Sequence, residues 1–226
     1  EFFWGCRLAD FYQLSRGLKN KPENRPTATS SLISALTYDT NINMRRLNLG
    51  SGRDIKEGWV NLDSAKLPGV NVVHDIEKLP LPFEDCEFDE ILCQDILEHI
   101  EYQPVLKDLH RILTPGGKIT IRVPHFTSKN NFIDPTHKKR FSIYTFEMFV
   151  KDSPYAKSKE RDYYFDFHFS KISSVKIIFD HSSRWFFYNR LVEPLVNLNA
   201  ATKFIYESTG ICYDFPAQNI VVELIK

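Results

Sequence analysis

The chain has 226 residues, 42% of them hydrophobic and 26% charged, which suits a globular protein with one large domain or two small ones. Its 29 Lys and Arg balance its 29 Asp and Glu, which argues against a large basic surface and against nucleic acid as a partner. No apolar stretch approaches the roughly 20 residues that a membrane-spanning helix requires.

The cysteines indicate a reducing location. Cys6, Cys86, Cys93 and Cys212 have neither metal-ligand nor redox-pair spacing, so the sequence predicts no metal site. A reduced, cytoplasmic compartment fits this pattern best.

Residues 1–43 are expected to form an N-terminal helical extension or cap. Apolar side chains recur at helical spacing over residues 2–18, a polar stretch covers 19–31, and further helical turns are predicted over 32–38. The chain does not begin with Met, and Met44, just before the first predicted strand, is a candidate for the native start. The residues before Met44 are therefore either an accessory cap or a non-native extension. Residues 44–226 form the main predicted domain.

Residues 45–124 alternate short apolar strands with connectors. Strands are predicted from Arg45 and over 59–63, 70–76, 88–95 and 118–123, with a helix carrying the apolar residues between Leu97 and Leu113. Pro115, Gly116 and Gly117 are expected to stop that helix and turn the chain. This alternation is typical of βαβ units and a parallel sheet. Only residues 53–58 separate the first two strands, so the first crossover helix is predicted to be a single turn or absent.

After Thr127 the chain becomes irregular and aromatic. A polar loop over 134–141, a helix over 142–150 and a strand over 163–169, with aromatic residues at every odd position, are predicted. Strands over 175–179 and 220–225 are expected to pair antiparallel at one sheet edge. The insert between them, about 181–218, is predicted to be helical from Trp185 to Tyr206 and broken near Pro194.

A glycine-rich loop between the first two strands is typical of a nucleotide-type cofactor site. Leu49 leads into Gly50-Ser51-Gly52, and the second strand ends on Asp63. Glycines let the backbone approach a ligand closely, and a carboxylate at the next strand's tip can accept hydrogen bonds from a ribose diol. The alternative is a plain glycine turn with a capping Asp.

Five motifs in order resemble those of class I S-adenosylmethionine-dependent methyltransferases, closely over about residues 45–126. They are the loop Leu47–Gly52, the acid Asp63, the segment His74-Asp75-Ile76, the run from Leu79 through Gln94-Asp95-Ile-Leu-Glu-His99, and Leu113-Thr-Pro-Gly-Gly117. The resemblance implies a Rossmann-like, seven-stranded, mostly parallel sheet whose antiparallel last strand lies between strands five and six.

The resemblance also implies S-adenosylmethionine as the cofactor and S-adenosylhomocysteine as the product. The cofactor-binding residues that it implies are Leu49, Gly50, Ser51, Gly52, Asp63, His74, Asp75, Ile76, Gln94 and Asp95. Gly50→Val is expected to abolish binding by filling space that the ligand needs.

A dinucleotide site is the weaker reading of the same loop. It would require a third Gly where Ile55 stands and an acid about 20 residues further on, whereas Asp63 follows Gly52 after 11.

A base for the methyl acceptor should lie past the carboxyl ends of strands four and five. The residues that qualify by position are Asp95, His99, His125, Asp134 and His137. A histidine has the pKa best suited to proton removal near neutral pH, so His137 and His125 are the predicted catalytic residues. His137 also resembles a histidine that related methyltransferases carry after strand five.

The predicted function is methyl transfer to a small-molecule or sugar-type acceptor. Lys138-Lys139-Arg140, if it takes part, favours an anionic one. The alternatives are a catalytically silent scaffold or partner subunit that binds the cofactor, and an NAD-dependent oxidoreductase. The sequence does not determine the oligomeric state.

Overall fold

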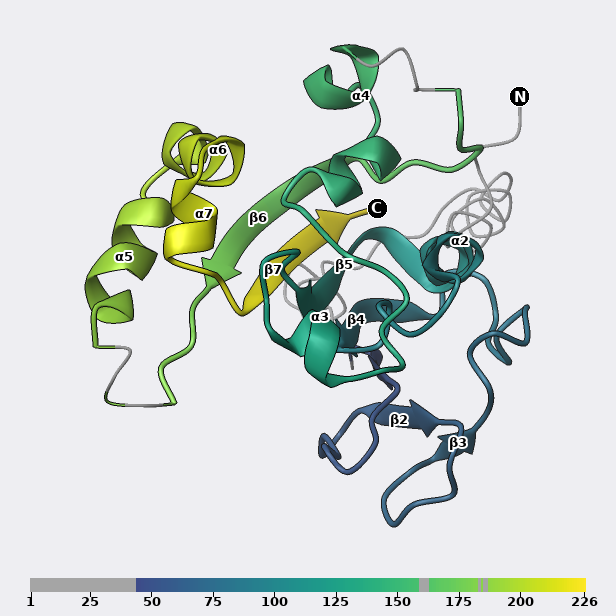
Figure 1. The fold of residues 1–226 in the computed structure, drawn as a ribbon. Coiled ribbons are helices and arrows are strands. Elements are labelled where there is room, and N and C mark those ends of the chain that lie inside the picture. Colours follow the sequence, from purple (N-terminus) through teal and green to yellow (C-terminus); the bar gives the residue numbers. More distant parts are fainter. Residues whose placement is uncertain (1–43, 159–162, 183, 185–186) are drawn as a thin grey trace, which may run out of the picture. The chain divides into compact units, whose positions relative to one another are not determined.

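The computed structural model describes residues 44–158, 163–182, 184 and 187–226. This part of the chain contains a seven-stranded sheet of order β3-β2-β1-β4-β5-β7-β6 (Figure 1). The strands are β1 (Arg46–Leu49), β2 (Val60–Asp63), β3 (Val72–Val73), β4 (Phe88–Gln94), β5 (Leu113–Pro124), β6 (Lys171–Ile178) and β7 (Asn219–Ile225). Strand β7 is antiparallel to both β5 and β6, while the pairs among β1 to β5 are parallel. The predicted Rossmann-like sheet is confirmed.

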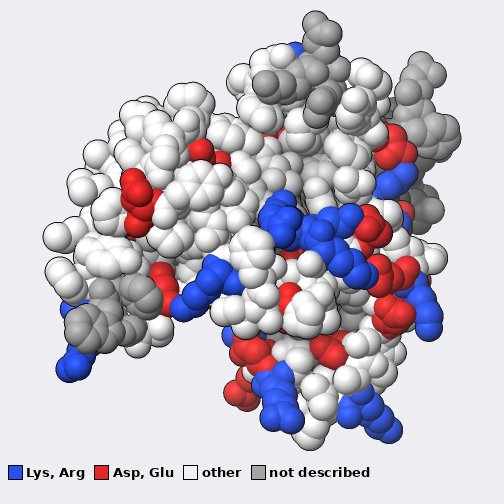
Figure 2. Space-filling model, viewed as in Figure 1, with Lys and Arg blue, Asp and Glu red and all other residues white. Residues whose placement is uncertain are grey.

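Helices flank the sheet and fill the C-terminal insert. They are α2 (Tyr102–Ile112), α3 (Asn130–Ile133), the 3-10 helix η1 (Thr145–Phe149), α4 (Pro154–Ser158), α5 (Asn189–Val196), α6 (Ala200–Ser208) and α7 (Ile211–Asp214). Helix α2 forms because its apolar residues share one face, which is buried: Val105, Leu106, Leu109 and Ile112. Helices α5, α6 and α7 stand together beside the end of β6 and β7 (Figure 1), and the surface there carries few charged side chains (Figure 2).

The connection between β1 and β2 contains no helix in the described chain, as its length predicted. Buried asparagine side chains hold it instead. Asn48 Nδ2 donates to Asn61 Oδ1 over 2.9 Å and to the Asp54 carbonyl over 2.8 Å, and Asn61 Oδ1 also accepts from the Lys56 backbone N–H. The backbone N–H of Asn61 donates in turn to Asn71 Oδ1 over 2.7 Å. This ladder of asparagines gives the connector the hydrogen bonds that a helix would have supplied internally.

Several predicted boundaries were wrong. The strand expected over 70–76 is reduced to Val72–Val73, because the chain leaves the sheet on either side of this short edge pairing. The helix expected between Leu97 and Leu113 begins only at Tyr102, and Leu113 already belongs to β5, ahead of the expected turn. The helix expected over 142–150 is the single 3-10 segment η1.

The strand predicted over 163–169 is absent, although the alternation of aromatics was real. Only Phe169 forms a bridge, to Val150. Phe165 and Phe167 pack on Phe149, with ring centroids 4.3 and 5.7 Å apart. The aromatic rings are therefore used in side-chain packing, and the backbone of this segment has no neighbouring strand to pair with along its length.

The break expected near Pro194 lies a few residues later. Pro194 is inside α5, and the helix ends at Val196, with Asn197 as its C-cap. Asn199 then caps α6 by accepting a hydrogen bond from the Thr202 N–H over 3.0 Å. Asparagine caps, rather than the proline, set the boundary between the two helices.

The predicted antiparallel pairing of 175–179 with 220–225 is confirmed, with the helices of the insert between β6 and β7. The helices predicted over 2–18 and 32–38 lie outside the described residues. Among the helices that the structure does describe, none combines the length and the apolar character needed to cross a membrane.

Candidate active site

The glycine-rich loop and Asp63 come together at the carboxyl ends of β1 and β2. Gly50 and Gly52 have φ angles of +60° and +50°, a backbone conformation that suits glycine. The Gly52 N–H donates to Asp63 Oδ2 over 2.7 Å, and the Ser51 N–H donates to the Leu62 carbonyl over 2.9 Å. Asp63 therefore fixes the loop in addition to presenting a carboxylate beside it.

Two features of this loop fit a bound nucleoside-type cofactor. A Cβ added to Gly52 would meet no atom within 4 Å, so the backbone there is open to a ligand. The Ser51 Oγ is buried without a hydrogen-bond partner among the described residues, and such a group gains from a ligand that supplies one.

A side chain at Gly50 would meet the protein as well as any ligand. A Cβ at Gly50 would lie 2.2 Å from Cδ1 of Ile96, so the added side chain would first clash with the protein itself. The change would disturb folding as well as binding.

The segment His74-Asp75-Ile76 follows β3 and lies next to the end of β2. The His74 backbone N–H donates to the Asp63 carbonyl over 2.9 Å, which brings the two segments together. The His74 ring binds the Lys78 carbonyl, Asp75 accepts from the Glu77 N–H, and Ile76 packs on the core. The second carboxylate oxygen of Asp75, Oδ2, makes only a long ion pair of 3.8 Å with Lys78, so it could still accept a hydrogen bond from a ligand.

Gln94 ends β4, and Asp95 follows it with a φ angle of +53°. The Asp95 carboxylate forms an ion pair with Arg122 of β5 and accepts a hydrogen bond of 3.3 Å from Asn219 of β7. The strained backbone of Asp95 thus places its side chain across the ends of three adjacent strands.

A polar cleft of about 510 Å³ opens at this point. It lies past the ends of β4, β5 and β7, and its lining residues are Asp95, Glu98, His99, Arg122, Pro124, Asn130, Ile133, Asp134, His137, Ile178, Gln218 and Asn219. Parallel α/β sheets bind ligands at this edge. Of the predicted base candidates, the cleft brings together all but His125.

Glu98 is the cleft residue that sequence reasoning missed, although it lies inside the motif that ends at His99. Its side chain is 0% exposed, and neither carboxylate oxygen has a hydrogen-bond partner among the described residues. Burial raises the pKa of Glu98 to about 7. Only its position after a strand, next to His99, could have signalled it.

His137 lies beside Glu98. Its Nε2 atom is 4.0 Å from Glu98 Oε1 and 3.8 Å from Asp134 Oδ2, and its ring meets that of His99 edge-on at 4.6 Å. Burial and then the neighbouring His99 lower the pKa of His137, which favours a neutral imidazole.

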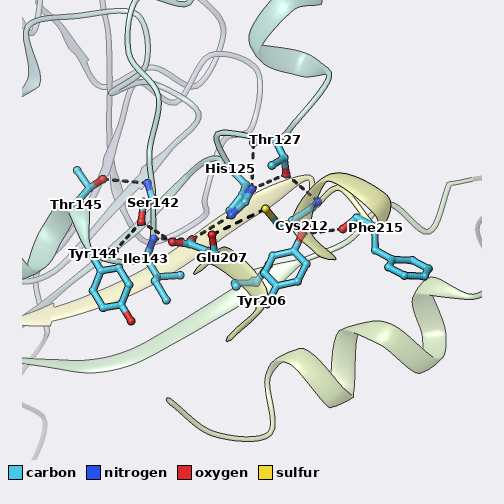
Figure 3. A network of polar contacts seen from close by, with 12 residues as sticks. His125, Thr127, Ser142, Ile143, Tyr144, Thr145, Tyr206, Glu207, Cys212 and Phe215 are labelled. Carbon is cyan, nitrogen blue, oxygen red and sulfur yellow. Dashed lines mark hydrogen bonds and ion pairs between the residues drawn. The ribbon is translucent and has the colours of Figure 1, made fainter. Parts of the chain in front are cut away.

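His125 is in a different environment. Its side chain is 0% exposed, and both ring nitrogens are bonded: Nε2 to Glu207 over 3.1 Å and Nδ1 to the Thr127 hydroxyl over 2.7 Å (Figure 3). The Thr127 N–H also donates to Nδ1, so this nitrogen accepts and Nε2 carries the hydrogen. The ring therefore has no free lone pair with which to take a proton from a methyl acceptor. The geometry gives no support to the prediction of a catalytic His125.

Residues 43–121 match the family model described as "Methyltransferase domain". An uncharacterized protein of Methanocaldococcus jannaschii is 35% identical over 74 residues, which are 33% of this chain and 32% of that protein. A demethylmenaquinone methyltransferase of Staphylococcus epidermidis is 31% identical over 115 residues, 49% of this chain and 45% of that protein. The chain thus spans 32% and 45% of the length of these two curated relatives.

A solved S-adenosylmethionine-dependent methyltransferase from Archaeoglobus fulgidus aligns over 81% of this chain and 86% of its own, with a TM-score of 0.49 and 20% identity.

The family match and the strand order agree on the class of protein. The fold is that of the class I methyltransferases, with the antiparallel strand β7 between β5 and β6. The match of residues 43–121 to a methyltransferase domain agrees with the motifs, and S-adenosylmethionine is the cofactor that such a domain implies.

Proposed function

We propose that the protein transfers a methyl group from S-adenosylmethionine to a small-molecule or sugar-type acceptor. The observation that supports this most is an adjacency: the glycine loop, Asp63 and the 74–76 segment meet at the ends of β1 to β3, directly beside the cleft past β4 and β5. A cofactor bound at the ends of β1 to β3 would present its reactive end to the cleft. The similarity to a demethylmenaquinone methyltransferase supports an acceptor of small-molecule type.

The chain's own residues divide the work of holding the cofactor. Asp63 would accept hydrogen bonds from the ribose hydroxyls and Asp75 from the adenine amino group, and Ile76 would pack against the ring. Ser51 supplies its buried hydroxyl. The bound cofactor supplies a methyl group on a sulfonium, already activated for displacement.

On the acceptor side, the protein chiefly aligns the nucleophile with the methyl group. We propose His137 as the acceptor-side catalytic residue, because it alone of the two predicted histidines lines the cleft. His125 is proposed instead as a structural residue.

The charges of the cleft favour a neutral, hydroxylated acceptor over the predicted anionic one. Asp95 and Asp134 line the cleft with Arg122, and Arg122 is already paired with Asp95. Lys139, in the basic run, is paired with Glu101. An anion would therefore meet little uncompensated positive charge.

The domain boundary and the location remain proposals. We propose residues 44–226 as the methyltransferase domain and residues 1–43 as an N-terminal extension or cap. The division of the chain into the units Glu1–Met44 and Arg45–Lys226 supports this boundary. The proposed cytoplasmic location rests on the spacing of the cysteines alone, and the disulfide bond that Cys86 forms in the structure weighs against a reducing compartment.

Titration calorimetry with S-adenosylmethionine tests the cofactor side. Asp63→Ala should weaken binding by roughly 2–4 kcal/mol, the scale of charged hydrogen bonds left unmade. Part of that loss is structural, because Asp63 also holds the Gly52 N–H. Asp166→Ala, which removes an exposed carboxylate paired with Lys107, is the matched control and should bind like the wild type. Unchanged affinity in Asp63→Ala would remove Asp63 from the site.

Transfer of labelled methyl groups to a metabolite extract separates the enzyme from a silent scaffold. An active wild type with a tight-binding cofactor supports the enzyme, whereas binding without transfer to any acceptor favours the scaffold. An NAD-dependent oxidoreductase is not proposed, because the turn after the glycine loop, Arg53–Gly58, offers no helix N-terminus to a pyrophosphate.

A further inference from the structure

The geometry points to a site for a divalent transition-metal ion in the cleft, formed by Glu98, His99 and His137. One potential donor atom from each of these side chains lies within 4.8 Å of the others. A zinc-type ion bonds N and O donors at about 2.0–2.2 Å, so donors bound to one ion lie roughly 3–4 Å apart. Small side-chain rotations would close the present spacing around an ion. The sequence predicted no metal here because the ligands come from segments about 40 residues apart.

The carboxyl group of Glu98 is buried and needs a bonding partner. Its side chain is 0% exposed, and neither oxygen is bonded within the described chain. Buried carboxyl groups are normally paired or bound to a metal, since an unpaired charge in a protein interior is strongly unfavourable. A cation between Glu98 and the two imidazoles would satisfy it.

Hydrogen bonding fixes the tautomer of His99. The Thr136 hydroxyl donates to Asp134 Oδ1 over 2.6 Å, so it must accept from His99 Nδ1, 2.8 Å away. The Nε2 atom of a neutral His99 then carries a lone pair. Metal-binding histidines are oriented in this way, with the second ring nitrogen donating to a neighbouring oxygen.

His137 has space for an ion where a hydrogen bond would otherwise be expected. Its Nδ1 atom is buried without a partner, and its Nε2 atom is 4.0 Å from Glu98 and 3.8 Å from Asp134. Both of these separations exceed a hydrogen bond. The imidazole therefore lies among carboxylates without being bonded to either of them.

The two segments that carry the ligands are already tied together. The backbone N–H groups of Lys138 and Lys139 both donate to the Glu98 carbonyl, over 2.7 and 3.1 Å. The site is consequently preformed and does not depend on an ion to bring distant segments together. Two imidazoles and one carboxylate suit first-row transition ions better than Mg²⁺ or Ca²⁺, which prefer oxygen ligands.

This site would give the acceptor-side role of His137 a specific form, and that part of the inference rests on the proposed function. Three protein ligands leave coordination positions open toward the cleft. A hydroxyl of the acceptor bound there would lose its proton more readily, since a divalent ion lowers the pKa of a bound oxygen. His137 would act as a ligand and not as the base: the ion would stabilise the deprotonated acceptor oxygen, and the proton would pass to water in the cleft. An acceptor with two neighbouring oxygens would fit best, because it can chelate.

Metal binding itself is tested without cofactor or acceptor, so its failure is distinct from failure of the proposed function. Purified full-length protein is stripped with a chelator, dialysed and titrated with Co²⁺, followed by calorimetry and by the visible absorption of the bound ion. Zn²⁺ and Mg²⁺ are then compared by competition. One Co²⁺ per chain is expected, displaced by Zn²⁺ and not by an equal concentration of Mg²⁺.

Four variants locate the ion. Glu98→Gln and His137→Asn should each weaken Co²⁺ binding by at least about 100-fold. Thr136 only orients His99, so Thr136→Val should weaken binding by about 10- to 100-fold. The matched control is His181→Asn, from the exposed His181–Glu193 pair at 2.9 Å, which should bind as the wild type does. Melting temperatures in chelator identify any variant that fails to fold.

Three results would overturn the assignment. They are the absence of stoichiometric Co²⁺ binding in the wild type, wild-type affinity in both folded Glu98→Gln and folded His137→Asn, and tighter binding of Mg²⁺ than of Co²⁺ and Zn²⁺.

Discussion

Two buried pairs of a glutamate and a histidine occur among the described residues, and their surroundings differ. Glu207, with its side chain 5% exposed, accepts hydrogen bonds from His125, the Ser142 hydroxyl at 2.5 Å and the Ile143 N–H at 2.9 Å (Figure 3). Glu98, with its side chain 0% exposed, has no such partner among the described residues and lies 4.0 Å from His137. Both pairs join segments that are far apart in the sequence.

The difference separates a structural pair, His125 and Glu207, from the pair that we propose to be functional, His137 and Glu98. Fully bonded polar groups in a core hold one arrangement of the chain, and they have no capacity left for a ligand. Unbonded groups at a cleft destabilise the protein unless something binds them, so their presence indicates a site. Burial alone does not distinguish the two pairs; the number of hydrogen bonds does.

The largest expected effect is on turnover. Once an acceptor is identified, His137→Ala should lower turnover by about 10²–10⁴, the usual contribution of a positioned proton-transfer group, while cofactor affinity stays nearly intact. The same change at His125 should leave turnover per folded molecule much less affected. Steady-state kinetics of both variants, corrected for folded fraction, measures this. Full turnover in His137→Ala would exclude it from the chemistry.

Removing the bonded glutamate should affect stability instead. Glu207→Ala leaves the His125 ring, the Ser142 hydroxyl and the Ile143 N–H without their acceptor, which should lower the free energy of unfolding by about 3–5 kcal/mol. Urea denaturation of the variant and the wild type measures the change. An unaltered midpoint would mean that the network does not hold the insert against the sheet.

Removing the unbonded glutamate, Glu98, should change the free energy of unfolding in the opposite direction. In chelator at pH 8, Glu98→Gln should raise the free energy of unfolding by about 1–3 kcal/mol, because it removes a buried unpaired charge. Since the pKa of Glu98 is raised to about 7, the folded wild type binds more protons than the unfolded chain between pH 4.5 and 7. The wild type therefore loses stability as pH rises through this range, and the gain from the variant should vanish near pH 4.5. Denaturation at both pH values checks the sign, and a destabilised variant at pH 8 would contradict it.

The sequence was sufficient for those parts of the fold and site that depend on local pattern. Gly50 and Gly52 needed positive φ angles and have them, and Asp63, at the tip of β2, contacts the loop as its position implied. The six residues from Arg53 to Gly58 left no space for a helix, and none formed. The position of β7 between β5 and β6 came from resemblance to a family, not from the pattern of its own residues.

The remainder depended on contacts between distant segments. Alternation over 163–169 indicated that aromatic side chains of this segment would be packed, as Phe167 and Phe169 are. It could not show that Phe165 and Phe167 pack on Phe149 without a strand to pair with. His125 and His137 looked equivalent because both follow β5. What separates them is Glu207, 82 positions from His125, and the unbonded Glu98. No local pattern reports the hydrogen bonds that a buried side chain lacks.

The asparagine ladder has a consequence for how the cofactor would bind. Because Asn48, Asn61 and Asn71 already hold the connector next to the glycine loop, little chain entropy is left to be lost on association. Binding to such a preorganised loop should change heat capacity only by the amount expected for the apolar surface that the ligand covers, without the larger change that accompanies coupled folding. Removing one of these side-chain amides, as in Asn61→Ala, would leave the connector less ordered in the free protein. Part of the entropy cost of ordering it would then be met at each binding event and not when the domain folds.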